Sequence, residues 1–308
     1  MLDMQIPASL NFKKLTPEDK PWVDELVLPC SSRSADFNFG SLFLWDSLFS
    51  PTVAVLGGRL IVKAQRRGEI FFSFPVGCGE LAPAVDAILA CARAEGLACT
   101  IRGVEEKGIE QLESAFPGRF RFEEDRAAAD YIYSAEALAT LSGKALHAKR
   151  NHINTLERSM IWRFETLERR HFDACRELLE TWYDSNVVVN DLGLHENRAL
   201  NRAFEFYEQL GLLGGALFVE DSLVAFTMGE LVAADALDVH FEKADASLPG
   251  AYPLINREFA RRALSVYPEL KYINREEDMG LENLRRAKMS YRPAYILRKF
   301  VAREIEAK

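Results

Sequence analysis

Three ionisable residues alternate along one strand that the sequence predicts. Successive side chains of a strand point to opposite faces, so Asp238, His240 and Glu242 share one face. A carboxylate or an imidazole in such a position can accept a proton from an attacking amine or hydroxyl group. We therefore expect this face to line a cleft, with Glu242 as a general base and His240 as an alternative base or an orienting group. An exposed sheet face is the competing interpretation.

A second group of charged residues surrounds a short predicted helix near the C-terminus. At about 100° per residue, Arg285 and Lys288 share a face with Leu281 and Leu284. Cations on a half-apolar face can stabilise a developing oxyanion, although long cations also reach past such a face to water. Asp278 precedes the helix and is the second candidate for the general base. The segment before it carries further polar residues: Asn274, Glu276 and Glu277.

The segment 141–160 predicts a basic helix. Lys149 falls inside its apolar stripe, while His147, Arg150 and Asn154 form a second stripe with spacings of three and four residues. These side chains are candidates for binding the phosphates of a substrate, and a solvated basic helix face is the alternative.

Coenzyme A is weakly indicated. The segment Arg93–Ala98 fits an RxxGxA pattern, but Gly96 lies where a predicted helix ends and is better explained as a C-cap. The loop 247–251, before a later predicted helix, has a single glycine and no basic residue, so it lacks the chemistry of a pyrophosphate-binding turn.

Composition excludes several classes of protein. A formal net charge of −8 disfavours a general DNA-binding protein. The five cysteines show no CxxC spacing, so neither a zinc site nor a disulfide framework is expected. Neither a bilayer-spanning run nor a signal peptide is visible, and reduced thiols suit the cytoplasm.

The elements that must position these residues follow the same order in both halves. Each half predicts a helix, a meander of strands, and then a strand–helix–strand unit. That is the GNAT arrangement, so we expect an α/β fold of the α+β type with two tandem GNAT-like acyltransferase units. Each unit is a mixed, mostly antiparallel sheet flanked by helices. The boundary is expected near residue 140, giving units 1–140 and 141–308, with the active cleft in the second.

The expected helices and strands have the following residue ranges. In the first half we expect helices at 16–28, 81–95 and 108–116 and strands at 52–56, 60–64, 70–76, 99–104 and 129–134. In the second half we expect helices at 141–160, 172–183, 197–210, 252–266 and 281–288. The strands there are expected at 162–167, 213–220, 223–231, 236–242, 270–274 and 295–301. The aromatic stretch 37–49 is expected in the first core, with an acyl pocket as the alternative.

Four segments resemble a known family. They are 142–154, His-Phe-Glu-Lys-Ala-Asp at 240–245, Asn-Arg-Glu-Glu-Asp-Met-Gly at 274–280 with Leu284 and Arg285, and Lys-Met-Ser-Tyr-Arg-Pro at 288–293. Together they resemble soluble proteins related to the C-terminal domain of bacterial phosphatidylglycerol lysyltransferase. The resemblance implies a tandem GNAT fold akin to Fem-type aminoacyl transferases. It also implies an activated acyl donor, aminoacyl-tRNA or acyl-CoA, in the second unit. The lysyltransferases carry a membrane-embedded segment before this domain; the absence of one here argues against a phospholipid acceptor and leaves peripheral membrane contact open.

The expected activity is acyl transfer to an amine or hydroxyl acceptor, without an enzyme nucleophile and without a metal. The alternative is a non-catalytic protein that binds a phosphate-bearing ligand in the same cleft. The expected catalytic residues are Glu242, His240, Asp278 and Lys288. The expected substrate-binding residues are Lys149, Arg150, Asn154, Asn274, Arg285 and Tyr291.

Overall fold

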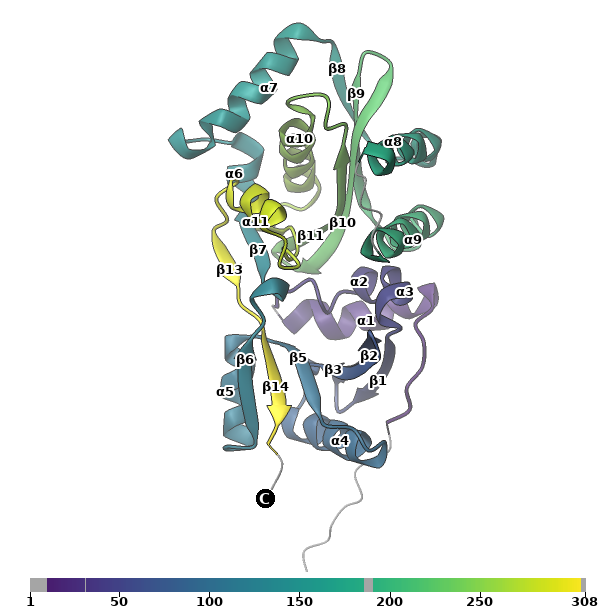
Figure 1. The fold of residues 1–308 in the computed structure, drawn as a ribbon, viewed down its shortest axis with the longest axis vertical. Helices are drawn as coiled ribbons and strands as arrows, with labels where there is room; N and C mark the ends of the chain where they lie inside the picture. The colour runs from purple at the N-terminus through teal and green to yellow at the C-terminus, as the bar shows by residue number, and fades with distance from the viewer. Residues whose placement is uncertain (1–9, 31, 186–190, 306–308) are drawn as a thin grey trace, which may run out of the picture.

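Two β-sheets, stacked end to end, form the frame of the molecule (Figure 1). In the computed structural model, which describes residues 10–30, 32–185 and 191–305, each sheet contains seven strands. The first sheet has the order β1-β2-β3-β5-β14-β6, with β4 paired to β2, and the second has the order β13-β7-β12-β11-β10-β9-β8. The fold is therefore mixed α+β with two GNAT-like units, as the element order predicts.

The strands of the first sheet are β1 Thr52–Leu56, β2 Arg59–Arg66, β3 Glu69–Ser73, β4 Val76–Gly77, β5 Thr100–Val104, β6 Phe120–Glu124 and β14 Phe300–Glu304. One face is covered by α4 Leu81–Ala94 and α5 Glu106–Ala115, which share a core with β2, β3, β5 and β14. The helices on the other face are α1 Lys20–Val27, α2 Phe39–Leu44 and α3 Asp46–Phe49, and they lie between the two sheets (Figure 1).

The strands of the second sheet are β7 Asp130–Ser134, β8 Trp162–Thr166, β9 Leu213–Val219, β10 Ser222–Ala233, β11 Ala236–Ala244, β12 Tyr272–Asn274 and β13 Tyr295–Leu297. On one face lie α6 Ala135–Thr140, α7 His147–Ser159 and the central helix α10 Ala251–Val266. On the other lie α8 Phe172–Ser185 and α9 Asp191–Glu205, while α11 Glu282–Met289 follows β12 (Figure 1).

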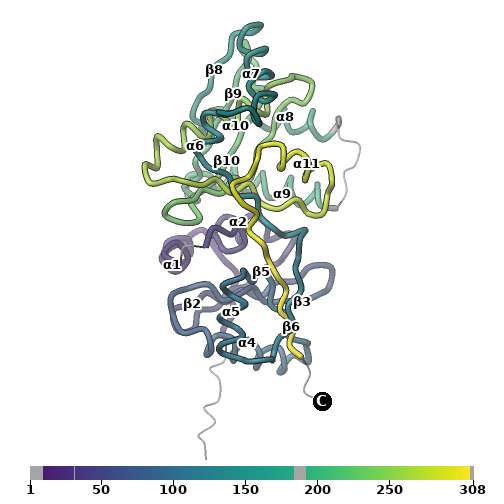
Figure 2. The backbone as a smooth tube through the Cα atoms, turned by 90° about the vertical axis from the view of Figure 1, so that its left-hand side faces the viewer, coloured from purple at the N-terminus to yellow at the C-terminus, as the bar shows by residue number. Residues whose placement is uncertain are grey.

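The sheets do not divide at residue 140. Strand β7 precedes that position but pairs with β12 and β13 of the second sheet, and β14 near the C-terminus is inserted between β5 and β6 of the first. The single strand expected at 295–301 is two strands in different sheets, joined across Arg298 and Lys299. Figure 2 shows this segment descending from the second sheet into the first. Each unit thus borrows a strand from beyond the expected boundary.

One apolar core joins the units. It contains α1 and α2 residues such as Val23 and Phe43 together with Phe204 of α9 and Phe226 of β10. The aromatic stretch 37–49 contributes Phe37 and the residues of α2 to it, whereas α3 has no buried residue. The sequence places this stretch in the core of the first unit, and in the structure that core is shared with the second unit. Asn38 caps α2 by accepting a hydrogen bond from the Ser41 backbone N–H at 2.6 Å.

Candidate functional site

The two parallel strands at the centre of the second sheet separate. Strand β12 pairs with β11 only from Ala236 opposite Tyr272 to Asp238 opposite Asn274. Beyond that point β11 continues to Ala244 along β10, while the chain after Asn274 turns into the loop 275–281 and α11. Charged side chains from both segments therefore gather where the strands part.

A β-bulge at His240 divides these side chains between the two faces of the sheet. Met228 of β10 pairs with Phe241 and the next residue, Gly229, pairs with Val239, so His240 is an extra residue in β11. Val239 packs in the core around α10, whereas Phe241 packs in the core shared with the first unit. The prediction that Asp238, His240 and Glu242 share a face is therefore wrong, because the bulge reverses the alternation before Glu242.

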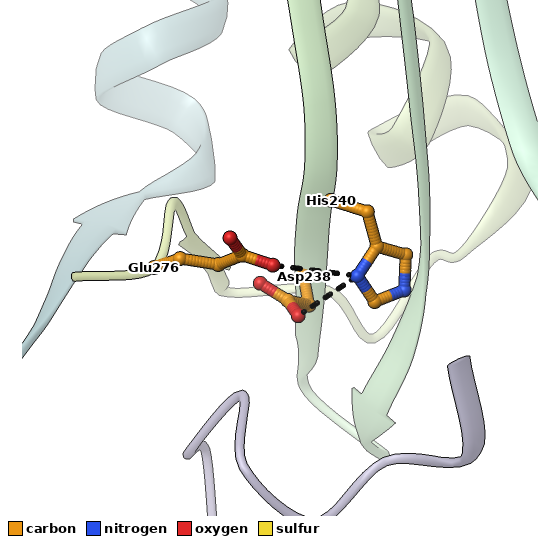
Figure 3. A group of neighbouring side chains, drawn as sticks. All are labelled: Asp238, His240 and Glu276. Atoms are coloured by element: carbon orange, nitrogen blue, oxygen red, sulfur yellow. Dashed lines mark hydrogen bonds and ion pairs between the residues drawn. The ribbon is translucent and has the colours of Figure 1, made fainter. Parts of the chain in front are cut away.

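On the face toward the first unit lies a group we call the joint cluster: Lys20, Glu230, Asp238, His240 and Glu276. The His240 side chain is fully buried, and its Nδ1 lies 3.4 Å from an oxygen of Asp238 and 3.4 Å from an oxygen of Glu276 (Figure 3). Its Nε2 lies 3.2 Å from Oε1 of Glu230, and Lys20 donates to Oε2 of Glu230 at 2.6 Å. Burial opposes the charged imidazolium, but the carboxylates of Glu230, Glu276 and Asp238 outweigh it and raise the pKa of His240 to about 10.

Asn274 extends this polar joint. Its amide Nδ2 donates to the Arg33 carbonyl at 2.7 Å and to Asp130 at 3.0 Å, and its Oδ1 accepts from the Glu276 N–H at 2.7 Å. Asp130 also receives the buried ammonium group of Lys299 at 2.9 Å. Asn274, expected to bind substrate, is thus fully buried among groups that join the two units.

On the opposite face lies a second group, which we call the α10-face cluster: Lys149, Glu242, Asn256, Arg275 and Tyr291. Arg275 donates from Nη2 to Glu242 at 2.7 Å, and Asn256 of α10 donates to the other oxygen of that carboxylate at 3.0 Å. The Tyr291 ring contacts two cations, with Lys149 Nζ 4.0 Å and Arg275 Cζ 4.7 Å from its centroid. Three expected site residues, Lys149, Glu242 and Tyr291, therefore meet here.

Polar groups of this cluster are left free. Nη1 of Arg275 and Oδ1 of Asn256 are buried and have no hydrogen-bond partner within the part of the chain that the structure describes. A buried donor and acceptor of this kind favour a polar ligand that completes them. Burial, reinforced by the positive charge of Arg275, lowers the pKa of Lys149.

Asp278 and α11 form a rigid support beside the cluster. Asp278 is fully buried and accepts from the Tyr131 hydroxyl at 2.6 Å, the Gly280 N–H at 2.8 Å and the guanidinium of Arg285 at 2.9 Å. Burial would raise its pKa, but Arg285 and the other donors hold the pKa well below the usual range of an aspartate. The structure thus places Asp278 and Arg285 in an ion pair with each other.

Lys288 holds the backbone of the loop 275–281. Its ammonium group donates to the Arg275 carbonyl and, at 2.6 Å, to the Glu277 carbonyl. Desolvation lowers the pKa of Lys288. The lysine therefore fixes the backbone that carries both Arg275 and Glu276.

The remaining two expected residues lie on α7. Arg150 donates to the carbonyl groups of Leu141 and Gly143, which ties α7 to the segment before it. Asn154 is exposed on the helix surface. Sequence reasoning missed Asn256 and Arg275; Arg275 stands within the quoted motif 274–280, whereas an asparagine inside an amphipathic helix gave no signal.

The two mixed sheets flanked by helices define a tandem GNAT-like fold, and the polar cluster lies where its central parallel strands part. Residues 30–303 match the family described as phosphatidylglycerol lysyltransferase, C-terminal, and the chain belongs to that family. A curated relative, an uncharacterized protein of Mycoplasmoides gallisepticum, is 24% identical over 180 residues. That alignment covers 57% of this chain and 56% of the relative, so it spans about half of the length of each.

Solved structures share the whole fold. A conserved protein of unknown function from Bacteroides thetaiotaomicron is 36% identical, with a TM-score of 0.92 over 96% of this chain and 100% of that chain. L-PGS from Bacillus licheniformis is 14% identical, with a TM-score of 0.68 over 96% and 94% of the two chains. FemX is 8% identical, with a TM-score of 0.57 over 95% and 97%. Within the described residues, every helix is too short or too polar to cross a lipid bilayer.

Proposed function

We propose that this chain transfers an aminoacyl group from aminoacyl-tRNA to an amine or hydroxyl acceptor at the α10-face cluster. The observation that carries the proposal is the buried Glu242 carboxylate beside a donor of Arg275 and an acceptor of Asn256, both without a hydrogen-bond partner among the described residues. Membership of a family described by a lysyltransferase supports an aminoacyl group as the cargo.

The residues of the cluster suit direct attack on an ester. The acceptor nitrogen or oxygen attacks the carbonyl carbon, and the bond from that carbon to the ribose oxygen breaks. Glu242 takes the proton that the acceptor loses and returns it to the departing ribose oxygen. Arg275 and Lys149 supply positive charge to the oxyanion that develops on the carbonyl. Atoms and charge therefore balance without a covalent enzyme intermediate.

The start of α10 favours aminoacyl-tRNA over acyl-CoA. A GNAT protein would hold the coenzyme A pyrophosphate at the turn before this helix. Here a Cβ placed on Gly250 would lie 2.6 Å from the backbone oxygen of His152, so α7 packs directly on that turn. Gly250 also has a φ of +104°, which a residue with a side chain rarely adopts. This turn leaves little space for a pyrophosphate.

The test is a transfer assay with the full chain. Labelled aminoacyl-tRNAs and acyl-CoA thioesters are offered with two kinds of acceptor, phosphatidylglycerol vesicles and small primary amines, and the acylated product is measured. We expect product from aminoacyl-tRNA, and a decrease of about 10²- to 10⁴-fold in rate for Glu242→Gln, which removes the base. Arg275→Lys should also slow transfer, because the unpaired Nη1 donor is lost.

The matched control is Glu123→Gln, the same chemical change on the exposed end of β6 in the first sheet, which should leave the rate unchanged. Binding of aminoacyl-tRNA without any product would contradict the proposal and favour the non-catalytic alternative. Transfer from acyl-CoA alone would overturn the assignment of the donor.

A further inference from the structure

The joint cluster has the geometry of a metal site. One atom each from Asp238, His240 and Glu276 lies within 4.8 Å of the other two (Figure 3). The Nδ1 atom of His240 is 3.4 Å from the nearest oxygen of each carboxylate. A tetrahedral ion with bonds of about 2.1 Å holds its ligand atoms about 3.4 Å apart. The two separations therefore match such an ion without movement of the imidazole, and the ion would replace the Nδ1 proton, which is released to solvent.

Glu230 orients the imidazole of His240 through the ring nitrogen that faces away from the proposed ion. Nε2 of His240 lies 3.2 Å from Glu230, which also accepts from the Gly40 N–H at 2.6 Å and from Lys20 at 2.6 Å. A carboxylate on the far nitrogen is the usual partner of a metal-bound histidine, because it fixes the ring and its tautomer. The close approach depends on Gly40: a Cβ there would lie 2.1 Å from Oε1 of Glu230 and 2.7 Å from Nε2 of His240.

An unpartnered oxygen points to a missing cation. Asp238 is fully buried: its Oδ2, the oxygen nearest His240, accepts from Asn38 at 3.1 Å, while its second oxygen, Oδ1, has no hydrogen-bond partner in the described ranges and would be satisfied if the carboxylate bound the ion through both oxygens. A buried carboxylate oxygen without a partner is costly, and a bound cation would remove that cost. Glu276 adds a second carboxylate from a backbone with φ of +54°, a strained conformation of the kind found at ligand sites.

We propose that Asp238, His240 and Glu276 bind one divalent transition-metal ion of the Zn²⁺ class, with Glu230 orienting the imidazole. One nitrogen and two carboxylate ligands suit Zn²⁺ better than Mg²⁺ or Ca²⁺, which prefer oxygen ligands alone. The cysteines, whose spacing argues against zinc, take no part in this site.

The ion would join two segments, β11 through Asp238 and His240 and the loop 275–281 through Glu276. Glu230, which contacts the far nitrogen of His240, connects this site to the first unit, because it accepts hydrogen bonds from Lys20 of α1 and from the Gly40 N–H of α2. Glu276 follows Arg275, whose side chain reaches the opposite face of the sheet. The ion would therefore fix the loop that positions Arg275 in the α10-face cluster.

The experiment is metal binding by the full chain after treatment with a chelator. Zn²⁺ is titrated by calorimetry and in competition with a chromophoric chelator, and Co²⁺ is added for its visible absorption bands. We expect one Zn²⁺ per chain, an absorption spectrum of four-coordinate Co²⁺, a higher Tm with Zn²⁺, and no comparable effect of Mg²⁺.

Variants separate this site from adventitious binding. Glu276→Gln, a partly exposed ligand, should weaken Zn²⁺ binding by roughly tenfold or more while the circular dichroism spectrum is retained. Glu242→Gln makes the same change on β11, the strand that carries Asp238 and His240, but on the opposite face of the sheet, and should bind Zn²⁺ like the parent. His240→Gln should remove the Co²⁺ bands. Absence of stoichiometric Zn²⁺ binding, or equal binding by the parent and Glu276→Gln, would overturn the proposal.

Discussion

His240 and Glu242 are two residues apart in β11, yet they belong to different parts of the molecule. His240 is enclosed by carboxylates at the joint between the units, and Glu242 is paired with Arg275 and Asn256 beneath α10. The residue-level consequence is that their substitutions should have different effects. Changes at Glu242 belong to the proposed transfer reaction, and changes at His240 belong to the joint and its proposed ion.

The Glu242–Arg275 pair should show strong energetic coupling. Glu242 is 7% exposed and Arg275 is 14% exposed, so removing one partner leaves a buried charge unpaired. We expect Arg275→Met to lower the free energy of unfolding by about 3–5 kcal/mol. The double variant Glu242→Gln with Arg275→Met should lose less than the sum of the single losses, by about 1–3 kcal/mol. Urea unfolding of all four proteins measures the coupling, and strictly additive losses would contradict it.

Asp19 should make stability depend on acid pH. Burial favours its neutral form, but hydrogen bonds from Lys13, the Trp22 indole and the Thr16 N–H outweigh this and lower its pKa from 3.8 to about 2. Because the folded pKa is below the unfolded value, this stabilisation is present above about pH 4 and is lost as the pH falls towards 2. Asp19→Asn should therefore be less stable than the parent at pH 7, with a difference that shrinks as the solution is acidified.

Urea unfolding at a series of pH values checks this dependence. Asp221→Asn, which changes a fully exposed carboxylate in the β9–β10 turn, is the control and should follow the parent at every pH. A constant difference between Asp19→Asn and the parent down to the lowest pH would show that Asp19 is not responsible.

At the scale of elements, the bulge in β11 depends on the residue opposite it. A Cβ on Gly229 would lie 2.0 Å from the backbone oxygen of Asp238, so the bulged pairing has room only for glycine. Gly229→Ala should cost about 1–3 kcal/mol, because backbone must move. Gly108→Ala in α5 is the matched control. There the new Cβ meets the Val104 side chain at 3.1 Å, and the gain in helix propensity of about 1 kcal/mol offsets the crowding.

The same element shows where prediction from sequence ends. Local signals were sufficient for β1, whose bounds match the expected 52–56, and for α4, which ends one residue before the expected position. Periodicity could not reveal the extra residue at His240, since a bulge is a property of the pairing with β10. The pairing of Glu242 with Arg275 was equally out of reach, because it depends on how β11 and β12 separate.

At the scale of the whole molecule, the two units are bound together by exchanged strands and by a shared core. β14 lies between β5 and β6 of the first sheet, and β7 lies between β12 and β13 of the second. Where the chain crosses, Lys299 is 1% exposed and pairs with Asp36 at 2.7 Å and Asp130 at 2.9 Å. Asp36 and Asp130 precede the expected boundary near residue 140 and Lys299 follows it. The two units should therefore unfold together.

Tryptophan fluorescence can test this cooperativity, because each unit contains its own reporters. Trp22 lies in α1 of the first unit and Trp162 in β8 of the second. Versions that keep only one of these, with Phe at the other tryptophan positions, should show the same urea midpoint. Lys299→Met leaves the fully buried Asp130 and the partly exposed Asp36 without their cation. It should lower the free energy of unfolding by about 3–5 kcal/mol and lower both midpoints together. If the two midpoints of Lys299→Met separate, so that Trp22 reports unfolding at a much lower urea concentration than Trp162, the crossing strands do not couple the units. The exposed substitution Lys144→Met should leave both midpoints where they were, since it lies outside the crossing.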